Sequence, residues 1–272
     1  MRAILKQAGM ATLALTLAAG GPVCAQISNV GDAESVAEDL ERAAEEPTSD
    51  VPDPWEGFNR KMFSTHLFLD HNILVPAAKA YRAVTPKKGR KGIRKFLHNA
   101  RTPVILINDI FQGEWKRAGK TTSRFVINST IGFLGFADPA AHMGIESHDE
   151  DFGQTLATWG VSSGPYLFLP LLGPSSIRDG FGAGVDLALD PLIWIRTDPA
   201  KYARYTRAGV TGMSVREPLI EPLEDIEEKS LDYYASLRSF YLQARKREIN
   251  NGRTTYEDLP DIGEFEEFDE LQ

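Results

Sequence analysis

The sequence predicts an all-α fold: a helical domain at residues 53–254 with one apolar hairpin-like loop, between two acidic, disordered segments. Apolar residues recur at helical spacing through most of this domain, whereas strand-like alternation is scarce. The stretch Phe152–Ile177 holds no charged side chain but seven glycines and prolines, which interrupt a helix before it could cross a bilayer. With 272 residues, the chain is long enough to bury a single hydrophobic core.

The first 25 residues form a predicted secretory signal peptide. Arg2 and Lys6 precede the apolar run Ala8–Ala19, and small residues before Gln26 suit cleavage. Export is therefore expected. Cys24, the single cysteine, stands where a lipid anchor could attach, but the residues before it make a weak lipobox, so we favour cleavage after Ala25. In either case no internal disulfide can form.

Charge divides the chain into three parts. Residues 26–52 carry a net charge of −7 and residues 255–272 a net charge of −8, and neither segment shows apolar periodicity. Both are predicted to be disordered. Because the whole chain carries −8 and the signal peptide +2, the domain between the acidic segments carries about +5.

The helices are predicted from caps and spacing. An Asp53 N-cap followed by Pro54 predicts where the first helix begins. Further helices are expected at 93–111, with a kink or break at Pro103, at 118–131, after a cap at Asp138, and at 175–189 and 226–248. The residues that repeat at helical spacing in the first helix are Phe58, Met62, Phe63 and Leu67.

The uncharged stretch contains the predicted hairpin. The turn dipeptides at Gly164 and Gly173 bracket Tyr166–Leu172, which fits a short edge strand because of Pro170. Its side chains either contact lipid acyl chains or fill the protein core. The residues expected to contact lipid or its interface are Trp159, Tyr166, Leu167, Phe168, Leu169, Pro170, Leu171 and Leu172.

No catalytic motif with a specific spacing occurs in the sequence, so a non-enzymatic protein without cofactor or metal is predicted. His142, His148, Asp149 and Glu150 could bind a metal, but their spacing matches no known ligand pattern and a polar loop explains them better. The export signal argues against nucleic-acid binding.

Two sets of polar residues each permit two interpretations. The asparagines Asn99, Asn108 and Asn128 either tie helices together or line a wet channel. A basic run either binds anionic headgroups or forms a solvated helix start. Its cations, the candidates for headgroup binding, are Lys87, Lys88, Arg90, Lys91, Arg94 and Lys95.

Several blocks of sequence, in fixed order, resemble the VacJ/MlaA family of outer-membrane phospholipid-transport proteins. They cover residues 53–247 and read DPWEGFNR (Asp53–Arg60), INDIFQG (Ile107–Gly113), RFVINSTIG (Arg124–Gly132), FGQTL (Phe152–Leu156), GPYLFLPLLGPSSIRD (Gly164–Asp179) and SLDYYASLRSFYLQ (Ser230–Gln243). The weak lipobox at Cys24 departs from the family pattern.

The resemblance implies a ring-like helical protein embedded in the inner leaflet of the outer membrane, beside a trimeric porin. Such a protein removes misplaced phospholipids through an amphipathic passage and delivers them to a periplasmic lipid carrier, with energy from an inner-membrane ATP-driven transporter. The residues expected to shape the passage are Phe58, Asn59, Met62, Phe63, Asn108, Asn128, Gly132, Gly153, Gly164, Pro165 and Gly173. The alternatives are a soluble periplasmic carrier or binding module for an apolar ligand, and a hydrolase acting through His142 and His148.

Overall fold

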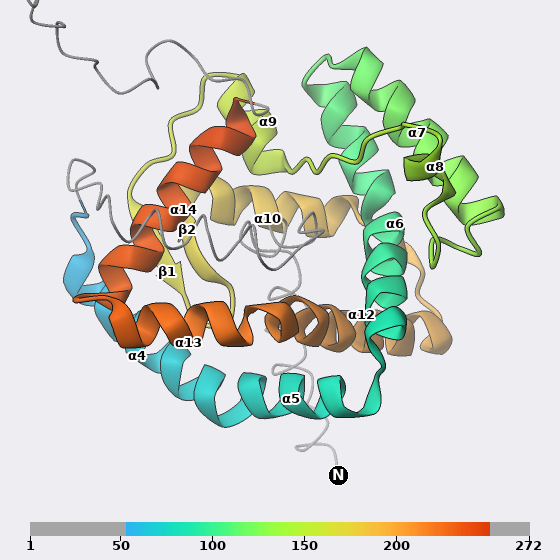
Figure 1. Cartoon of the computed structure of the whole chain (residues 1–272). Helices are drawn as coiled ribbons and strands as arrows, with labels where there is room; N and C mark the ends of the chain where they lie inside the picture. Colours follow the sequence, from blue (N-terminus) through green and yellow to red (C-terminus); the bar gives the residue numbers. More distant parts are fainter. Residues whose placement is uncertain (1–52, 251–272) are drawn as a thin grey trace, which may run out of the picture.

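The computed structural model describes residues 53–250 (Figure 1). The predicted signal peptide, with Cys24, and both acidic segments lie outside this part of the chain. The helical elements are α4 (Glu56–Leu69), the π-helix η1 (Asp70–Leu74), α5 (Val75–Val84), α6 (Lys87–Phe111), α7 (Trp115–Thr130), α8 (Pro139–His142), α9 (Phe152–Thr158), α10 (Ile177–Leu189), α11 (Pro191–Trp194), α12 (Asp198–Arg216), the 3₁₀ helix η2 (Glu217–Leu219), α13 (Ile220–Lys229) and α14 (Tyr233–Ile249).

The helices form a ring-like arrangement, and the all-α prediction is confirmed. In Figure 1, α4 and α5 run along the lower edge, α6 rises on the right, α10 crosses the upper part and α14 closes the left side. Within the described residues, the strands β1 (Tyr166–Leu169) and β2 (Gly173–Ser176) make one antiparallel pair. Its register pairs Tyr166 with Ser176 and Leu169 with Gly173, as expected for a short hairpin.

An aromatic cluster holds the hairpin against the helices. It joins β1 to α4 and α14, and its ring pairs meet edge to face, with Phe63 and Phe168 at 5.2 Å. Its buried members are Phe63, Tyr166, Phe168, Tyr234 and Tyr241. A second buried cluster, with Leu219, Ile226, Phe240 and Ala244, packs η2 and α13 against α14.

The side chain of Asn59 also attaches β1 to α4, because it forms hydrogen bonds with the backbone of β1. Its buried side-chain amide donates to the carbonyl of Tyr166 at 3.0 Å and accepts from the N–H of Phe168 at 2.9 Å. An asparagine side chain thus supplies the hydrogen bonds that a neighbouring strand would supply, which fixes the height of the hairpin over α4.

Three local predictions are corrected. The first helix begins at Glu56, later than expected after Asp53 and Pro54. The carboxylate of Asp53 accepts from the N–H of Trp55 at 3.2 Å, and also from the side chain of Asn59 at 2.9 Å and from the hydroxyl of Tyr234. The chain stays helical through Pro103, so no break occurs there. The helix expected at 226–248 is two helices, because Asp232 caps a new one by accepting from the N–H of Ala235 at 3.2 Å.

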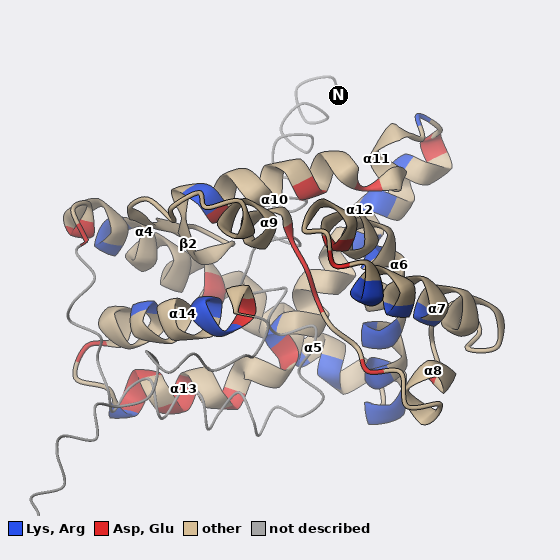
Figure 2. Ribbon diagram, turned by 90° about the horizontal axis from the view of Figure 1, so that it is seen from above, with Lys and Arg blue, Asp and Glu red and all other residues tan. Residues whose placement is uncertain are grey.

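Other local predictions are confirmed. Asp138 accepts from the N–H of Ala141 at 3.1 Å and caps α8. The helix expected at 175–189 is α10, which begins at Ile177 after a cap at Ser176. In the region that the structure covers, no helix combines the length and the apolar character required to span a membrane. Charge is unevenly distributed: seen from above, Lys and Arg gather along α6, whereas Asp and Glu gather on α13 (Figure 2).

Candidate functional site

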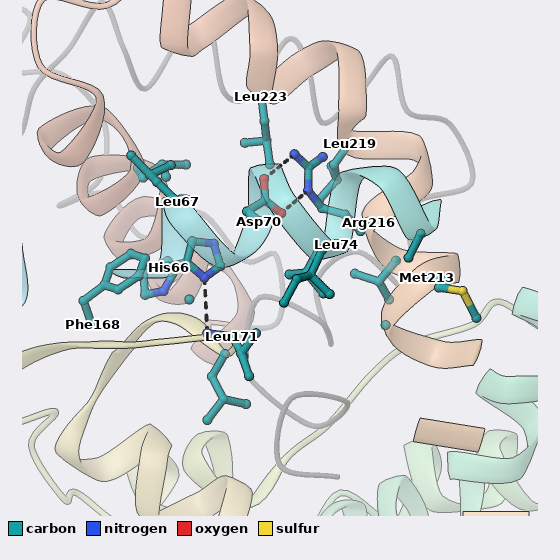
Figure 3. A pocket seen from close by; sticks show the side chains of 18 of the residues that line it. His66, Leu67, Asp70, Leu74, Phe168, Leu171, Met213, Arg216, Leu219 and Leu223 are labelled. Carbon is teal, nitrogen blue, oxygen red and sulfur yellow. Dashed lines mark hydrogen bonds and ion pairs between the residues drawn. The ribbon is translucent and has the colours of Figure 1, made fainter. Parts of the chain in front are cut away.

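An apolar pocket with a volume of about 390 Å³ lies beneath the hairpin turn (Figure 3). Its walls come from segments far apart in the sequence: α4 with η1, the turn between β1 and β2, and the stretch from α12 to α14. Most of its lining is aliphatic, including Leu67, Leu74, Leu171, Leu172 and Met213. Its volume falls within the range usual for sites that bind small molecules.

The hairpin turn closes one side of this pocket in a strained conformation. Leu171 has a φ of 69°, a left-handed value that a side chain with a Cβ disfavours, and Gly173 has a φ of 82°. The N–H of Leu172 donates to the carbonyl of Leu169 at 3.2 Å, which tightens the turn. Strain of this kind persists only where surrounding contacts hold it.

His66 of α4 supplies one of those contacts. The N–H of Leu171 donates to Nδ1 of His66 at 3.2 Å, so the neutral ring carries its proton on Nε2. Burial lowers the pKa of His66, while the nearby Asp70 opposes this shift. The imidazole therefore stays neutral at neutral pH and remains able to accept this hydrogen bond.

An ion pair forms the polar end of the pocket. Arg216 of α12 binds Asp70 of η1 in a bidentate manner, with Nε to Oδ1 at 2.8 Å and Nη2 to Oδ2 at 2.7 Å. The remaining nitrogen, Nη1, is buried and has no hydrogen-bond partner. One unused donor therefore stands at the edge of an otherwise apolar space, an arrangement that suits an amphiphile with a hydrocarbon part and an oxygen-bearing part.

The structure divides the predicted hairpin residues into three groups. Tyr166 and Phe168 are 2% and 1% exposed and pack in the aromatic cluster, so for them the core interpretation holds. Leu171 and Leu172 line the pocket, and Phe168 also borders it. Leu167, Leu169 and Pro170 are half-buried.

Trp159 lies away from the hairpin, at the end of α9. Its indole ring is 55% exposed, contacts Phe111 and Phe152, and donates from Nε1 to the carbonyl of Phe111 at 3.1 Å. An exposed aromatic ring with a satisfied polar atom is typical of a membrane interface.

Only one residue expected to shape the passage lines the pocket: Gly173. Met62, Phe63 and Asn59 support the hairpin from α4, whereas Phe58 is half exposed. Gly164 and Pro165 lead into β1, Gly164 with a φ of 67°.

The asparagines tie helices together, and Gly153 permits a close helix contact. Asn108 donates to Asp186 at 2.9 Å and accepts from Thr155 at 2.8 Å, linking α6, α10 and α9. A Cβ at Gly153 would lie 2.5 Å from Nη2 of Arg245 and 2.6 Å from Oδ1 of Asp179, so these side chains would have to shift to admit a larger residue. Asn128 and Gly132 belong to the turn after α7, described below.

The six cations of the basic run fall into two groups, ion-paired arginines and exposed lysines. Arg90 and Arg94 lie 3.2 and 3.4 Å from the buried carboxylate of Glu217, so they are engaged within the protein. The lysines Lys87, Lys88, Lys91 and Lys95 are exposed on α6.

The polar loop considered as a metal site serves ion pairing instead. His148 lies 2.9 Å from Asp109, Arg101 lies 3.2 Å from Asp149, and Arg117 lies 2.6 Å from Glu150. Within residues 53–250, no three His, Cys, Asp or Glu side chains come together as metal ligands.

Most of the pocket wall was not predicted from the sequence. Ala208, Met213 and Arg216 belong to α12, whose sequence shows no clear apolar periodicity, and Asp70 belongs to η1. One signal was present: Asp70 shares helical spacing with Leu67 and Leu74, so a charged residue interrupts an apolar face.

Residues 51–248 match the model of a protein family described as "MlaA lipoprotein". The chain is 31% identical to the "Intermembrane phospholipid transport system lipoprotein MlaA" of Escherichia coli (strain K12) over 212 residues, which are 76% of this chain and 82% of that protein. It is also 31% identical to the protein of the same name in Haemophilus influenzae, covering 78% of this chain and 86% of that one. An uncharacterized protein of Rickettsia typhi is 32% identical over 202 residues, 74% of this chain and 79% of its own length.

A solved structure is similar as well. A chain from work on the "structural basis for maintenance of bacterial outer membrane lipid asymmetry" superposes with a TM-score of 0.64 at 31% sequence identity. The match covers 74% of this chain and all of that one.

Proposed function

Because the chain belongs to the MlaA lipoprotein family, we propose that it is a non-enzymatic component of phospholipid transport at the outer membrane. In this role it removes mislocalised phospholipids from the outer leaflet through an amphipathic passage and transfers them to a periplasmic carrier. This maintains the lipid asymmetry of the membrane.

The observation that carries the proposal is the pocket beneath the hairpin. A phospholipid needs an apolar surface for its acyl chains and a polar group near its glycerol esters or phosphate. The pocket offers aliphatic side chains such as Leu171 and Met213, with Arg216 at one end. Burying acyl surface there stabilises the bound lipid by about 25 cal/mol per Å².

The turn at Leu171 would control entry to this site. It is held through one hydrogen bond to His66 and carries two residues with positive φ, so a small rotation would expose or cover the pocket. Irregular backbone is tolerated at membrane depth where it faces protein or water, which suits this location.

Membrane attachment and partners are parts of the same proposal. The inner leaflet of the outer membrane, a trimeric porin, the periplasmic carrier and, indirectly, an inner-membrane ATP-driven transporter complete the pathway. The exposed Trp159 is a candidate contact with the membrane interface.

Charged substitutions in the turn test the function. Replacing Leu171 and Leu172 with Asp should place two carboxylates against the apolar lining and abolish complementation of a strain lacking the natural gene. Outer-leaflet phospholipid and sensitivity to detergent with EDTA are the measurements. Leu231→Asp is the control, because this fully exposed residue lies between α13 and α14 and does not line the pocket.

Full complementation by the Leu171/Leu172 variant, with normal protein levels, would exclude this pocket as the lipid route. Fractionation with identification of co-purifying proteins distinguishes the alternative function. A chain that remains in the periplasmic fraction without a porin, yet carries lipid, would be a soluble carrier.

A further inference from the structure

The turn that follows α7 presents an unusual amount of apolar surface to solvent. Four of its six residues are large and apolar, and their exposed fractions are 70% for Ile131, 78% for Phe133, 61% for Leu134 and 43% for Phe136. Single exposed apolar residues are common, but a contiguous group of this size marks an interaction surface. In Figure 1 the end of α7 lies at the right-hand edge of the molecule, away from the hairpin.

The backbone adopts a disfavoured conformation to present these side chains. Phe133 and Leu134 have φ values of 53° and 60°, so two consecutive residues with bulky side chains occupy the left-handed region. Local strain of this kind is retained at functional sites when the surroundings enforce it.

Hydrogen bonds enforce this conformation from three sides. The N–H groups of Gly135 and Ala137 donate to the carbonyls of Asn128 and Gly132 at 2.8 and 2.9 Å. From α6, the side chain of Asn99 donates to the carbonyl of Leu134 at 3.3 Å. The turn is therefore a rigid projection and not a loose loop.

Two glycines allow this packing. A Cβ at Gly132 would lie 2.5 Å from the carbonyl oxygen of Asn128, and a Cβ at Gly135 would lie 2.4 Å from the Cβ of Asn99. Asn128 also donates to Asp138 at 2.9 Å, which fixes the far end of the turn. These residues support the projection, which explains where Asn128 and Gly132 act.

Exposed lysines lie beside the projection. Phe136 stacks on Phe96 of α6 at 4.9 Å, so this face of α6 meets the turn. Gly92 of α6 also faces the turn, since a Cβ there would lie 3.4 Å from the ring of Phe136, and Lys88 and Lys95 are its neighbours four residues before and three residues after. Lys91 adjoins both of these lysines at helical spacing. They are exposed, and the described part of the chain gives them no acidic partner.

These lysines are also unfavourably placed for the isolated protein. The first turn of α6 contains no acidic residue, so the positive end of the helix dipole lies beside the positive side chain of Lys88, and Lys91 and Lys95 follow at helical spacing. A bound anion would relieve this repulsion, which gives the lysines charge complementarity to anionic headgroups.

We propose that residues 131–136 form an interfacial wedge that inserts into the acyl region of a phospholipid bilayer, while Lys88, Lys91 and Lys95 bind anionic headgroups. Rigid apolar side chains beside flexible lysines match the depth profile of a membrane interface, where hydrocarbon gives way to phosphate. The wedge is separate from the pocket. It rests on the proposed function in that it assigns the membrane contact to named residues, and it holds for the protein without any lipid attached at Cys24.

Flotation with vesicles tests the wedge. The chain from Gln26 to the C-terminus is mixed with vesicles of phosphatidylethanolamine and phosphatidylglycerol, or of phosphatidylcholine alone. The double variant Phe133→Asn/Leu134→Asn keeps the backbone favourable, because asparagine tolerates left-handed φ values. We expect this variant to bind both vesicles at least about tenfold more weakly, with an unchanged or higher melting temperature.

Leu231→Asn is the matched control. Leu231 is fully exposed in the connection between α13 and α14, so its replacement removes an exposed leucine from another place and should leave binding unchanged. Equal binding by wild type and the Phe133/Leu134 variant would overturn the proposal. So would absence of wild-type binding to either vesicle, which would assign the turn to a protein partner such as a porin.

The lysines are tested separately. The triple variant Lys88→Gln/Lys91→Gln/Lys95→Gln should weaken binding to vesicles with phosphatidylglycerol roughly a hundredfold, about fivefold for each lysine, and abolish most of its salt dependence. Binding to phosphatidylcholine should change little. A triple control at other exposed lysines, Lys61, Lys79 and Lys201, should retain most of the binding. An equal loss in both triple variants would show only a general effect of charge and would overturn the headgroup assignment.

Because flotation requires no transport, the two proposals can fail independently. A Phe133/Leu134 variant that loses vesicle binding but binds lipid in the pocket would support the wedge alone. A Leu171/Leu172 variant that floats normally but fails to complement would support the pocket alone.

Discussion

The backbone N–H of Leu171 donates to Nδ1 of His66 across 3.2 Å, joining two residues 105 positions apart in the sequence. This hydrogen bond holds the turn of the hairpin against α4 and leaves Leu171 over the apolar pocket. A neutral imidazole is required for it, and burial keeps the ring neutral by lowering the pKa of His66.

Replacing His66 with Phe should release the turn. The ring remains apolar and of similar size, but the acceptor is lost, which costs about 1 kcal/mol and frees the left-handed Leu171 to relax. We expect faster amide hydrogen exchange at residues 169–173. His66→Gln, which offers a side-chain oxygen, should restore part of the protection, and the exposed His71→Phe should leave exchange in the turn unaltered.

The stability that the Asp70–Arg216 ion pair contributes should depend on the presence of both residues. Arg216→Leu leaves a carboxylate that is 5% exposed without its partner, so we expect a loss of about 3–5 kcal/mol in the free energy of unfolding. The double variant Asp70→Leu/Arg216→Leu should cost much less, because both charges are removed. Urea unfolding of the single and double variants measures this coupling.

The exposed pair between Asp225 and Lys229 provides the comparison. Asp225→Asn should change stability by less than about 1 kcal/mol. Equal costs for Arg216→Leu and for the double variant would mean that Asp70 gains nothing from the ion pair.

Gly135→Ala should destabilise the protein by more than the cost of the positive φ alone, because the added Cβ would also clash with a neighbouring side chain. Its φ is 95° and an added Cβ would meet Asn99 at 2.4 Å, whereas Gly113 has a φ of 76° with open space around it. We expect about 1 kcal/mol for Gly113→Ala and about 2–4 kcal/mol for Gly135→Ala. Thermal unfolding of both variants separates packing from backbone strain, and similar losses would contradict the rigid turn.

Glu150 should make the protein less stable as the pH rises. Burial raises the pKa of Glu150 to about 7, although Arg117 at 2.6 Å opposes the shift. Between its ordinary pKa near 4.5 and about 7, the folded protein retains a proton that the unfolded chain releases. Stability from this group is therefore present below pH 4.5 and is lost towards pH 7, by about 3 kcal/mol at most.

Glu150→Gln should remove this dependence, because the amide cannot titrate. The free energy of unfolding measured at pH 5 and pH 8 should differ less for this variant than for the wild type. The exposed Glu146→Gln serves as control and should keep the wild-type difference. A wild-type difference preserved in Glu150→Gln would assign the pH dependence to other groups.

Much of the fold follows from short-range patterns. Helical spacing located α4, α6, α7 and α10, and paired turn dipeptides located the hairpin between Gly164 and Gly173. Where prediction failed, a distant contact had changed the local preference. The first helix was expected to begin directly after Asp53 but begins at Glu56. The carboxylate of Asp53 accepts from the N–H of Trp55, and it also accepts from Asn59 and from the hydroxyl of Tyr234, which is 181 residues away.

The candidate sites were predicted less completely. Leu171 and Leu172 were expected to meet lipid and do line the pocket, while Tyr166 and Phe168 from the same run are core residues. Alternation along β1 places successive side chains on opposite faces, but the sequence did not show which face meets α4 and α14. The rigid turn after α7 also required the structure, because its strained φ values depend on contacts with Asn99 and Asn128.

The sequence by itself determined the helical class, the family, the separation of acidic ends from a basic domain, and a hairpin too apolar and too interrupted for a spanning helix. Each of these depends on residues close together in the chain, where spacing and backbone preference act directly. Only the tertiary structure decided that Asp70 meets Arg216 to form the polar end of the pocket, and that α6 lies beside the turn after α7. Such pairings depend on which helix faces pack together, and many packings satisfy the same local pattern.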